Sequence, residues 1–114
     1  MTGLLRWAQA FLFTQLVEVP IYRMGLRCSF WRAFGASAIT HPLVWLAVVE
    51  SGWHASWTVR SACGETFAVV VEAIWFAVPV GGVGYGARRG ALWSLIANAA
   101  SFLLGLLAYR LFGG

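Results

Sequence analysis

The chain has 114 residues, of which 61% are hydrophobic and 11% are charged, and its formal net charge is +4. Soluble domains carry about 25% charged and about 45–50% apolar residues, so this composition argues against a water-soluble domain of this length, which could not bury so much apolar surface in one core. The arginines flank apolar runs and form no stripe, which argues against nucleic-acid binding and favours a protein surrounded by lipid.

Four apolar segments follow one another along the chain, and each is long enough to cross a bilayer as a helix of about 17 or more residues. They are separated by an arginine-bearing stretch, a polar stretch and a glycine-rich stretch. The predicted spans are residues 4–22, 33–49, 66–83 and 91–112. Because the connections are short, we expect one all-α domain over residues 1–114, an up-down bundle of four transmembrane helices.

The arginines predict an orientation for this bundle. Most of them lie in the first and third connections, residues 23–32 and 81–90. Positively charged connections stay on the cytoplasmic side, so we expect both termini outside the cytoplasm. All basic residues are Arg and all acidic ones Glu, as in a GC-rich genome, and a bacterial inner membrane is the expected location. Cys28 and Cys63 then lie on opposite faces and form no intramolecular disulfide.

A weak internal similarity suggests a duplication. When the chain is shifted by 57 positions, Arg32 falls on Arg89 and His41 falls on Asn98. Weak internal repeats are common in transporters, and a real repeat here would relate two helical hairpins by a pseudo-twofold axis along the membrane normal. Chance matches among apolar residues are the alternative interpretation.

Titratable and polar side chains occur inside the predicted spans, where a charged group costs about 2.5–3.5 kcal/mol on insertion scales. Helical spacing places them on one face of each helix, turned towards the bundle axis. Pro42 removes a backbone donor and so frees the carbonyl of Ala38 beside this set. The candidate cation site consists of Glu18, His41, Glu72 and Asn98. The supporting polar set consists of Gln15, Ser37, Thr40, Pro42 and Ser101.

Several functions fit this set. Carboxylates with an imidazole and an amide suit a divalent metal ion as cofactor or cargo, and a Glu–His pair also suits a proton relay. We therefore expect a protein that binds or translocates a cation, working alone, as a homodimer or with a larger membrane-protein partner. A purely structural pairing and an accessory subunit of a larger complex are the alternatives. An enzyme with a Ser37–His41 dyad oriented by Glu72 is a further one, although the common catalytic motifs are missing.

Overall fold

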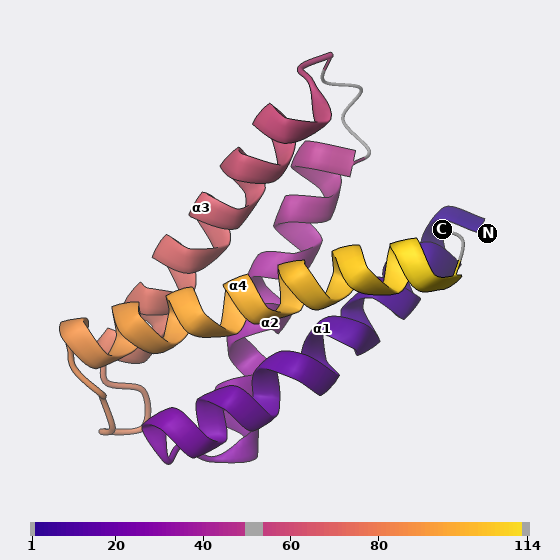
Figure 1. Cartoon of the computed structure of the whole chain (residues 1–114). Coiled ribbons are helices and arrows are strands. Elements are labelled where there is room, and N and C mark those ends of the chain that lie inside the picture. Colours follow the sequence, from indigo (N-terminus) through magenta and orange to yellow (C-terminus); the bar gives the residue numbers. More distant parts are fainter. Residues whose placement is uncertain (1, 50–53, 113–114) are drawn as a thin grey trace.

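The computed structural model describes residues 2–49 and 54–112, and these residues form four α-helices (Figure 1). The helices are α1 (Thr2–Leu26), α2 (Phe30–Val44), α3 (Trp57–Ala77) and α4 (Ala87–Phe112), and a π-helical turn, η1 (Trp45–Val49), continues α2. Helices adjacent in sequence pack against each other, and α4 also packs against α1. The predicted all-α bundle is confirmed.

The connection between α1 and α2 is only three residues long, residues 27–29, because local signals end one helix and start the next. Arg27 takes a positive φ of 55°, the left-handed conformation that commonly follows a helix C-terminus. Ser29 then caps α2 by accepting a hydrogen bond from the backbone N–H of Arg32 at 3.1 Å. The break expected over residues 23–32 is therefore mostly helical.

The third helix differs most from its predicted segment, residues 66–83. It begins at Trp57, where Ser56 accepts a hydrogen bond from the N–H of Val59 at 3.2 Å. It ends at Ala77, two residues before Pro79. The connection that follows contains a tight turn in which Val80 and Val83 exchange two backbone hydrogen bonds. Two glycines at positive φ, 61° and 82°, make this turn possible.

Arg32 at the start of α2 binds the end of α3. Its guanidinium is buried and donates to the carbonyls of Trp75 at 2.7 Å, Val78 at 2.6 Å, Val83 at 2.5 Å and Val80 at 3.3 Å. These carbonyls include the ones left without helical partners at the end of α3, a helix that Pro79 cannot extend. The group also lies 5.2 Å from the ring centroid of Trp75. Arg32 is therefore a buried cap and contributes no surface charge to the orientation argument.

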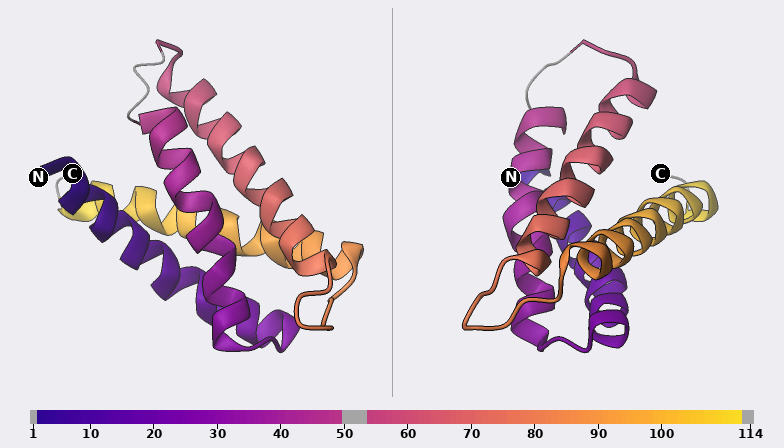
Figure 2. Two further views of the ribbon diagram at one scale, coloured as in Figure 1. Left: turned by 180° about the vertical axis from the view of Figure 1, so that it is seen from behind. Right: turned by 90° about the vertical axis from the view of Figure 1, so that its left-hand side faces the viewer.

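The helices converge at one end and spread apart at the other (Figures 1 and 2). The connections 27–29 and 78–86 lie at the convergent end. Away from this end, the α2–α3 pair and the α1–α4 pair point in different directions, and both termini lie near the far ends of α1 and α4. The core is correspondingly small and is built around Tyr22, Leu26, Ala33 and Phe76. Buried polar side chains contact this core, since the Tyr22 hydroxyl donates a hydrogen bond to Glu72.

Among the described residues, α4 is the one helix that is long and apolar enough to cross a membrane, with a mean hydropathy of 1.8 in its best window. α3 carries three charged residues, Arg60, Glu65 and Glu72, and α2 has only 15 residues before the π-helical turn. The predicted set of four membrane spans is therefore not confirmed.

Both cysteines are unpaired, as predicted, and their surroundings differ. Cys28 is buried in the connection between α1 and α2, and burial raises the pKa of its thiol, whereas Cys63 on α3 is exposed. Since the thiolate is the reactive form, we expect N-ethylmaleimide to modify Cys63 and to leave Cys28 unmodified in folded, detergent-solubilised protein. Intact-mass measurements on wild type and Cys63→Ser, with and without denaturant, check this. Rapid labelling of folded Cys63→Ser would contradict the packing of residues 27–29.

Candidate functional site

A buried carboxylate on α1 joins three helices. Glu18 is 1% exposed. Its Oε1 accepts a hydrogen bond from the hydroxyl of Ser37 on α2 at 2.8 Å, and its Oε2 accepts one from the hydroxyl of Ser101 on α4 at 2.6 Å. Glu18 is thereby fixed in place by short hydroxyl donors on both oxygens.

A second buried carboxylate, on α3, contacts the other three helices. Glu72 is also 1% exposed. Its Oε1 accepts hydrogen bonds from the Tyr22 hydroxyl on α1 and from the Asn98 amide on α4, the latter at 3.1 Å. Its Oε2 accepts one from the Thr40 hydroxyl on α2 at 2.6 Å. Together the two glutamates connect all four helices.

Helical spacing in the sequence produces this arrangement. Residues three or four apart lie on one face of a helix, so Glu18 and Tyr22 point inward together from α1, and Ser94, Asn98 and Ser101 do so from α4. The predicted inward orientation of these polar residues thus matches the structure. Gln15 is buried on the same face of α1, but its amide donates to the carbonyl of Phe34 at 3.2 Å. It supports the packing of α1 on α2 without reaching either carboxylate.

Neither carboxylate is paired with a basic group in the part of the chain that the structure describes. Arg32, the one arginine that is buried among the described residues, is bound to the carbonyls at the end of α3. Apart from the contact between the two carboxyl groups themselves, the donors that reach Glu18 and Glu72 are hydroxyls and one amide, all uncharged. The two carboxylates are therefore bound by uncharged polar groups and by no basic side chain.

His41 lies at the edge of this site. It lines a pocket of about 160 Å³ together with Glu18 and Glu72. Its Nδ1 is buried without a hydrogen-bond partner, and its ring packs among aromatic rings, with Phe11 at 5.5 Å and Trp7 at 5.9 Å between centroids. Pro42 follows it inside α2, shortly before the π-helical turn, a feature frequent at functional sites.

The dyad considered for an enzyme is not formed. The hydroxyl of Ser37 donates to Glu18, and the imidazole of His41 is surrounded by aromatic rings. Glu72 is bound by Thr40, Tyr22 and Asn98, so it does not orient His41. This geometry gives the catalytic alternative no support.

A third carboxylate belongs to the site and was not predicted. Glu65 on α3 is half-buried and lines the same pocket as Glu18 and Glu72. Glu65 precedes Glu72 by seven residues, two helical turns, so both project from one side of α3. The sequence predicts a third helix that starts at residue 66, which leaves Glu65 in the polar connection before it. The serine cap at Ser56 was the signal that would have placed it in the helix.

A metal centre is not assembled from the described residues. Within residues 2–49 and 54–112, no three His, Cys, Asp or Glu side chains are grouped to hold a metal ion. The amide nitrogen of Asn98 donates to Glu72, and both oxygens of each buried glutamate already accept a hydrogen bond from protein. This geometry gives a metal site at Glu18, His41, Glu72 and Asn98 no support.

Comparison with known protein families, with characterised proteins and with solved structures found no match to this chain. The function is therefore argued from the site alone.

Proposed function

We propose that this chain is a small integral membrane protein whose four helices cross the bilayer and whose Glu18 and Glu72 carboxylates bind and pass a proton. The outer surface supports this proposal, because each helix exposes large apolar side chains, an unfavourable arrangement in water. Examples from the four helices in turn are Leu12 and Leu16, Ile39 and Leu43, Val70 and Ile74, and Leu95 and Leu103.

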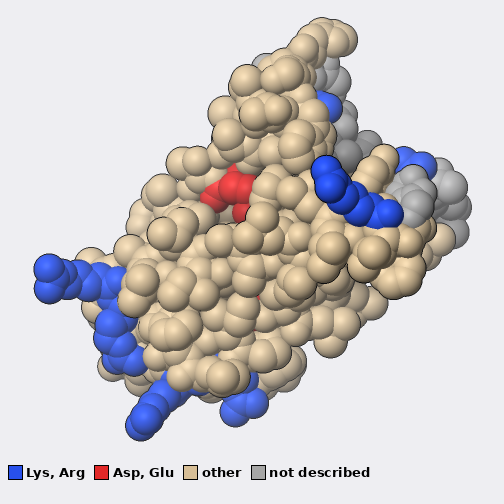
Figure 3. Space-filling view, in the orientation of Figure 1, with Lys and Arg blue, Asp and Glu red and all other residues tan. Residues whose placement is uncertain are grey.

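The distribution of charge supports a membrane location too. In Figure 3 the arginines gather at the end that carries the connections 27–29 and 78–86 and at the opposite side near the termini. The surface between them shows no basic group and a single acidic patch, which lies in a hollow. Polar residues lower the mean hydropathy of α1 and α3, yet Gln15, Glu18 and Glu72 are buried inside. The outward faces of these helices are thus more apolar than their sequences suggest.

The observation that carries the proton proposal is the pair of buried carboxylates without a basic partner. A buried carboxylate is costly in its charged form, so the pair is neutralised by bound protons or by another cation. Hydroxyl groups both donate and accept hydrogen bonds, so those of Ser37, Thr40 and Ser101 can rearrange as a proton arrives or leaves. An unpartnered imidazole nitrogen at His41 lies on the rim of the same pocket. These features suit proton movement better than a fixed metal ion.

An accessory role beside a larger membrane protein is the second candidate. The observation that favours it is the low burial of α4. Only 17% of the most apolar stretch of this helix is buried inside the protein. The helices spread apart at one end (Figures 1 and 2), and α2 and α3 expose apolar side chains such as Leu43 and Trp57 that a partner or a second copy could cover. A partner of this kind would be recovered by cross-linking in native membranes.

Proton movement is measured with purified protein in vesicles that contain a pH-sensitive dye. After a potassium diffusion potential is imposed with valinomycin, we expect the wild type to move protons faster than protein-free vesicles. Glu72→Gln and Glu18→Gln should each lower this rate at least tenfold, because an amide does not exchange a proton in this range. Cys63→Ser, an exposed change on α3, is the control and should behave as wild type.

Two results would contradict the proposal. One is a rate equal to that of protein-free vesicles for folded wild-type protein. The other is an unchanged rate in the double variant Glu18→Gln/Glu72→Gln, provided that its helical content equals that of the wild type.

A further inference from the structure

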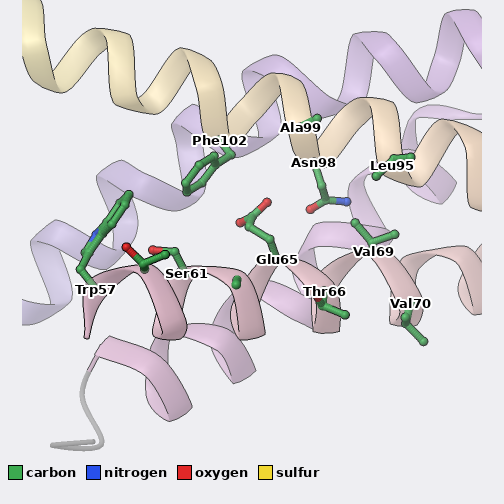
Figure 4. A pocket seen from close by; sticks show the side chains of 12 residues that line it. Trp57, Ser61, Glu65, Thr66, Val69, Val70, Leu95, Asn98, Ala99 and Phe102 are labelled. Atoms are coloured by element: carbon green, nitrogen blue, oxygen red, sulfur yellow. The ribbon is translucent and has the colours of Figure 1, made fainter. Parts of the chain in front are cut away.

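A pocket between α3 and α4 lies next to the carboxylate site and has a different character. Its volume is about 590 Å³, within the range of about 300–1,000 Å³ typical of small-molecule sites. Figure 4 shows side chains from both helices facing the space between them. Its walls are mainly apolar and include Trp57, Val69, Val70, Leu95, Ala99 and Phe102.

One carboxylate projects into this pocket. Figure 4 shows Glu65 pointing from α3 towards α4, between Phe102 and Asn98. Glu65 is half-buried, and in the part of the chain that the structure describes no hydrogen-bond donor or basic side chain contacts its carboxylate. The wall beside it includes stacked aromatic rings of Trp57 and Phe102, with centroids 6.0 Å apart. Aromatic faces attract cations, so the apolar wall and the unpaired carboxylate favour the same kind of ligand.

We propose that this pocket binds a lipophilic organic cation, a single positive charge carried on an aromatic or alkyl body, with Glu65 as its counter-charge. An inorganic cation would find one carboxylate and few other ligands there. An organic anion would face repulsion from the Glu65 carboxylate. An uncharged molecule, such as a lipid tail, would fill the apolar space and leave the Glu65 carboxylate without a partner.

The pocket also gives this ligand a connection to the buried carboxylates. Glu65, Asn98 and Phe102 line both this pocket and the smaller one that contains Glu18 and Glu72. A cation held at Glu65 therefore changes the charge beside the site where a proton would bind. This coupling rests on the proposed function, whereas binding of the cation by the pocket does not.

The test measures binding of radiolabelled tetraphenylphosphonium to purified protein in detergent by equilibrium dialysis. We expect saturable binding to wild-type protein that is weakened about tenfold in Glu65→Gln. Ala99→Leu, which adds volume to the pocket wall without changing charge, should weaken it to a similar extent. Cys63→Ser, an exposed change outside the pocket lining, should bind as the wild type does. Triphenylphosphine oxide, an uncharged analogue, should bind more weakly and equally to wild type and Glu65→Gln.

The outcomes separate this inference from the proposed function. Absence of saturable binding, or binding that neither Glu65→Gln nor Ala99→Leu weakens, overturns the inference, and so does equal affinity for the uncharged analogue. Helical content and thermal midpoint in the same detergent show whether each variant is folded. Binding that depends on Glu65 in a protein that moves no protons would uphold the pocket and contradict the proposed function. Proton movement without binding would contradict the pocket alone.

Discussion

Arg32→Ala is expected to lower the free energy of unfolding by about 3 kcal/mol or more and to disorder the connection between α3 and α4. The Arg32 guanidinium makes three hydrogen bonds of 2.5–2.7 Å to carbonyls at and after the end of α3. A hydrogen bond to a charged group contributes about 1.5–3 kcal/mol, and the carbonyls left behind would lose their donor in a partly buried place. The variant also loses the ring contacts with Trp75 and Tyr85. Chemical unfolding in mixed micelles, followed by circular dichroism, measures the change.

Arg32→Lys and Arg89→Ala complete this experiment. Lysine keeps the charge but cannot reproduce the planar fork that reaches several carbonyls at once, so we expect only partial recovery of stability. Arg89 is exposed, and its bonds to the carbonyls of Gly25 and Leu26 are long, at 3.4 Å. We therefore expect Arg89→Ala to cost less than about 1 kcal/mol. Equal losses for Arg32→Ala and Arg89→Ala would show that the buried cap is not what stabilises this end.

The roles of these two arginines bear on the suggested duplication. Arg32 opens α2 and binds carbonyls at the end of α3, while Arg89 opens α4 and binds carbonyls at the end of α1. Glu18 on α1 and Glu72 on α3 each accept hydrogen bonds from α2 and from α4. Exchanging the α1–α2 hairpin with the α3–α4 hairpin would turn each of these contacts into its counterpart. This is the symmetry that the 57-residue shift suggests. The duplication stays a prediction, now with corresponding contacts to support it.

The inward polar set could be predicted because it depends on local periodicity. Spacings of three and four residues place Glu18 beside Tyr22 and Asn98 beside Ser101, whatever the packing of the helices. Short connections likewise predict helices that are antiparallel to their sequence neighbours, and the bundle follows from that. These features need no knowledge of distant contacts.

The parts that could not be predicted depend on contacts between distant residues or on one helix boundary. The partners of Arg32 lie 43–51 residues away, so nothing near it in the sequence distinguishes a buried cap from a surface charge. Glu65 was missed because the polar stretch before it resembles a connection, although a serine cap starts α3 at Trp57. His41 has the residue type of a ligand, yet its ring packs against Trp7 and Phe11, helical residues of α1.

Glu72→Ala is expected to be the most destabilising change at the carboxylate site. It removes the acceptor for the Tyr22 hydroxyl, the Thr40 hydroxyl and the Asn98 amide, which then remain buried. Each unsatisfied buried group costs about 1–3 kcal/mol, so a loss of about 3–5 kcal/mol is expected if some of them find new partners. Unfolding in mixed micelles with Trp fluorescence as the signal measures this loss.

Glu72→Gln and Glu65→Ala separate a structural role from a chemical one. In Glu72→Gln the introduced amide keeps the shape and an acceptor oxygen, and the Thr40 hydroxyl can turn to accept from its N–H while donating to the carbonyl of Ala36, 3.2 Å away. We therefore expect a loss below about 1.5 kcal/mol for Glu72→Gln, near that of one net hydrogen bond. Glu65→Ala, on the same helix but without a bound donor in the described residues, should cost still less. If Glu65→Ala were as destabilising as Glu72→Ala, the loss of stability would come from removing a carboxylate from α3 and not from the lost hydrogen bonds.

If Glu72→Gln is stable and yet moves no protons, Glu72 acts through its exchangeable proton, since its packing and most of its hydrogen bonds remain.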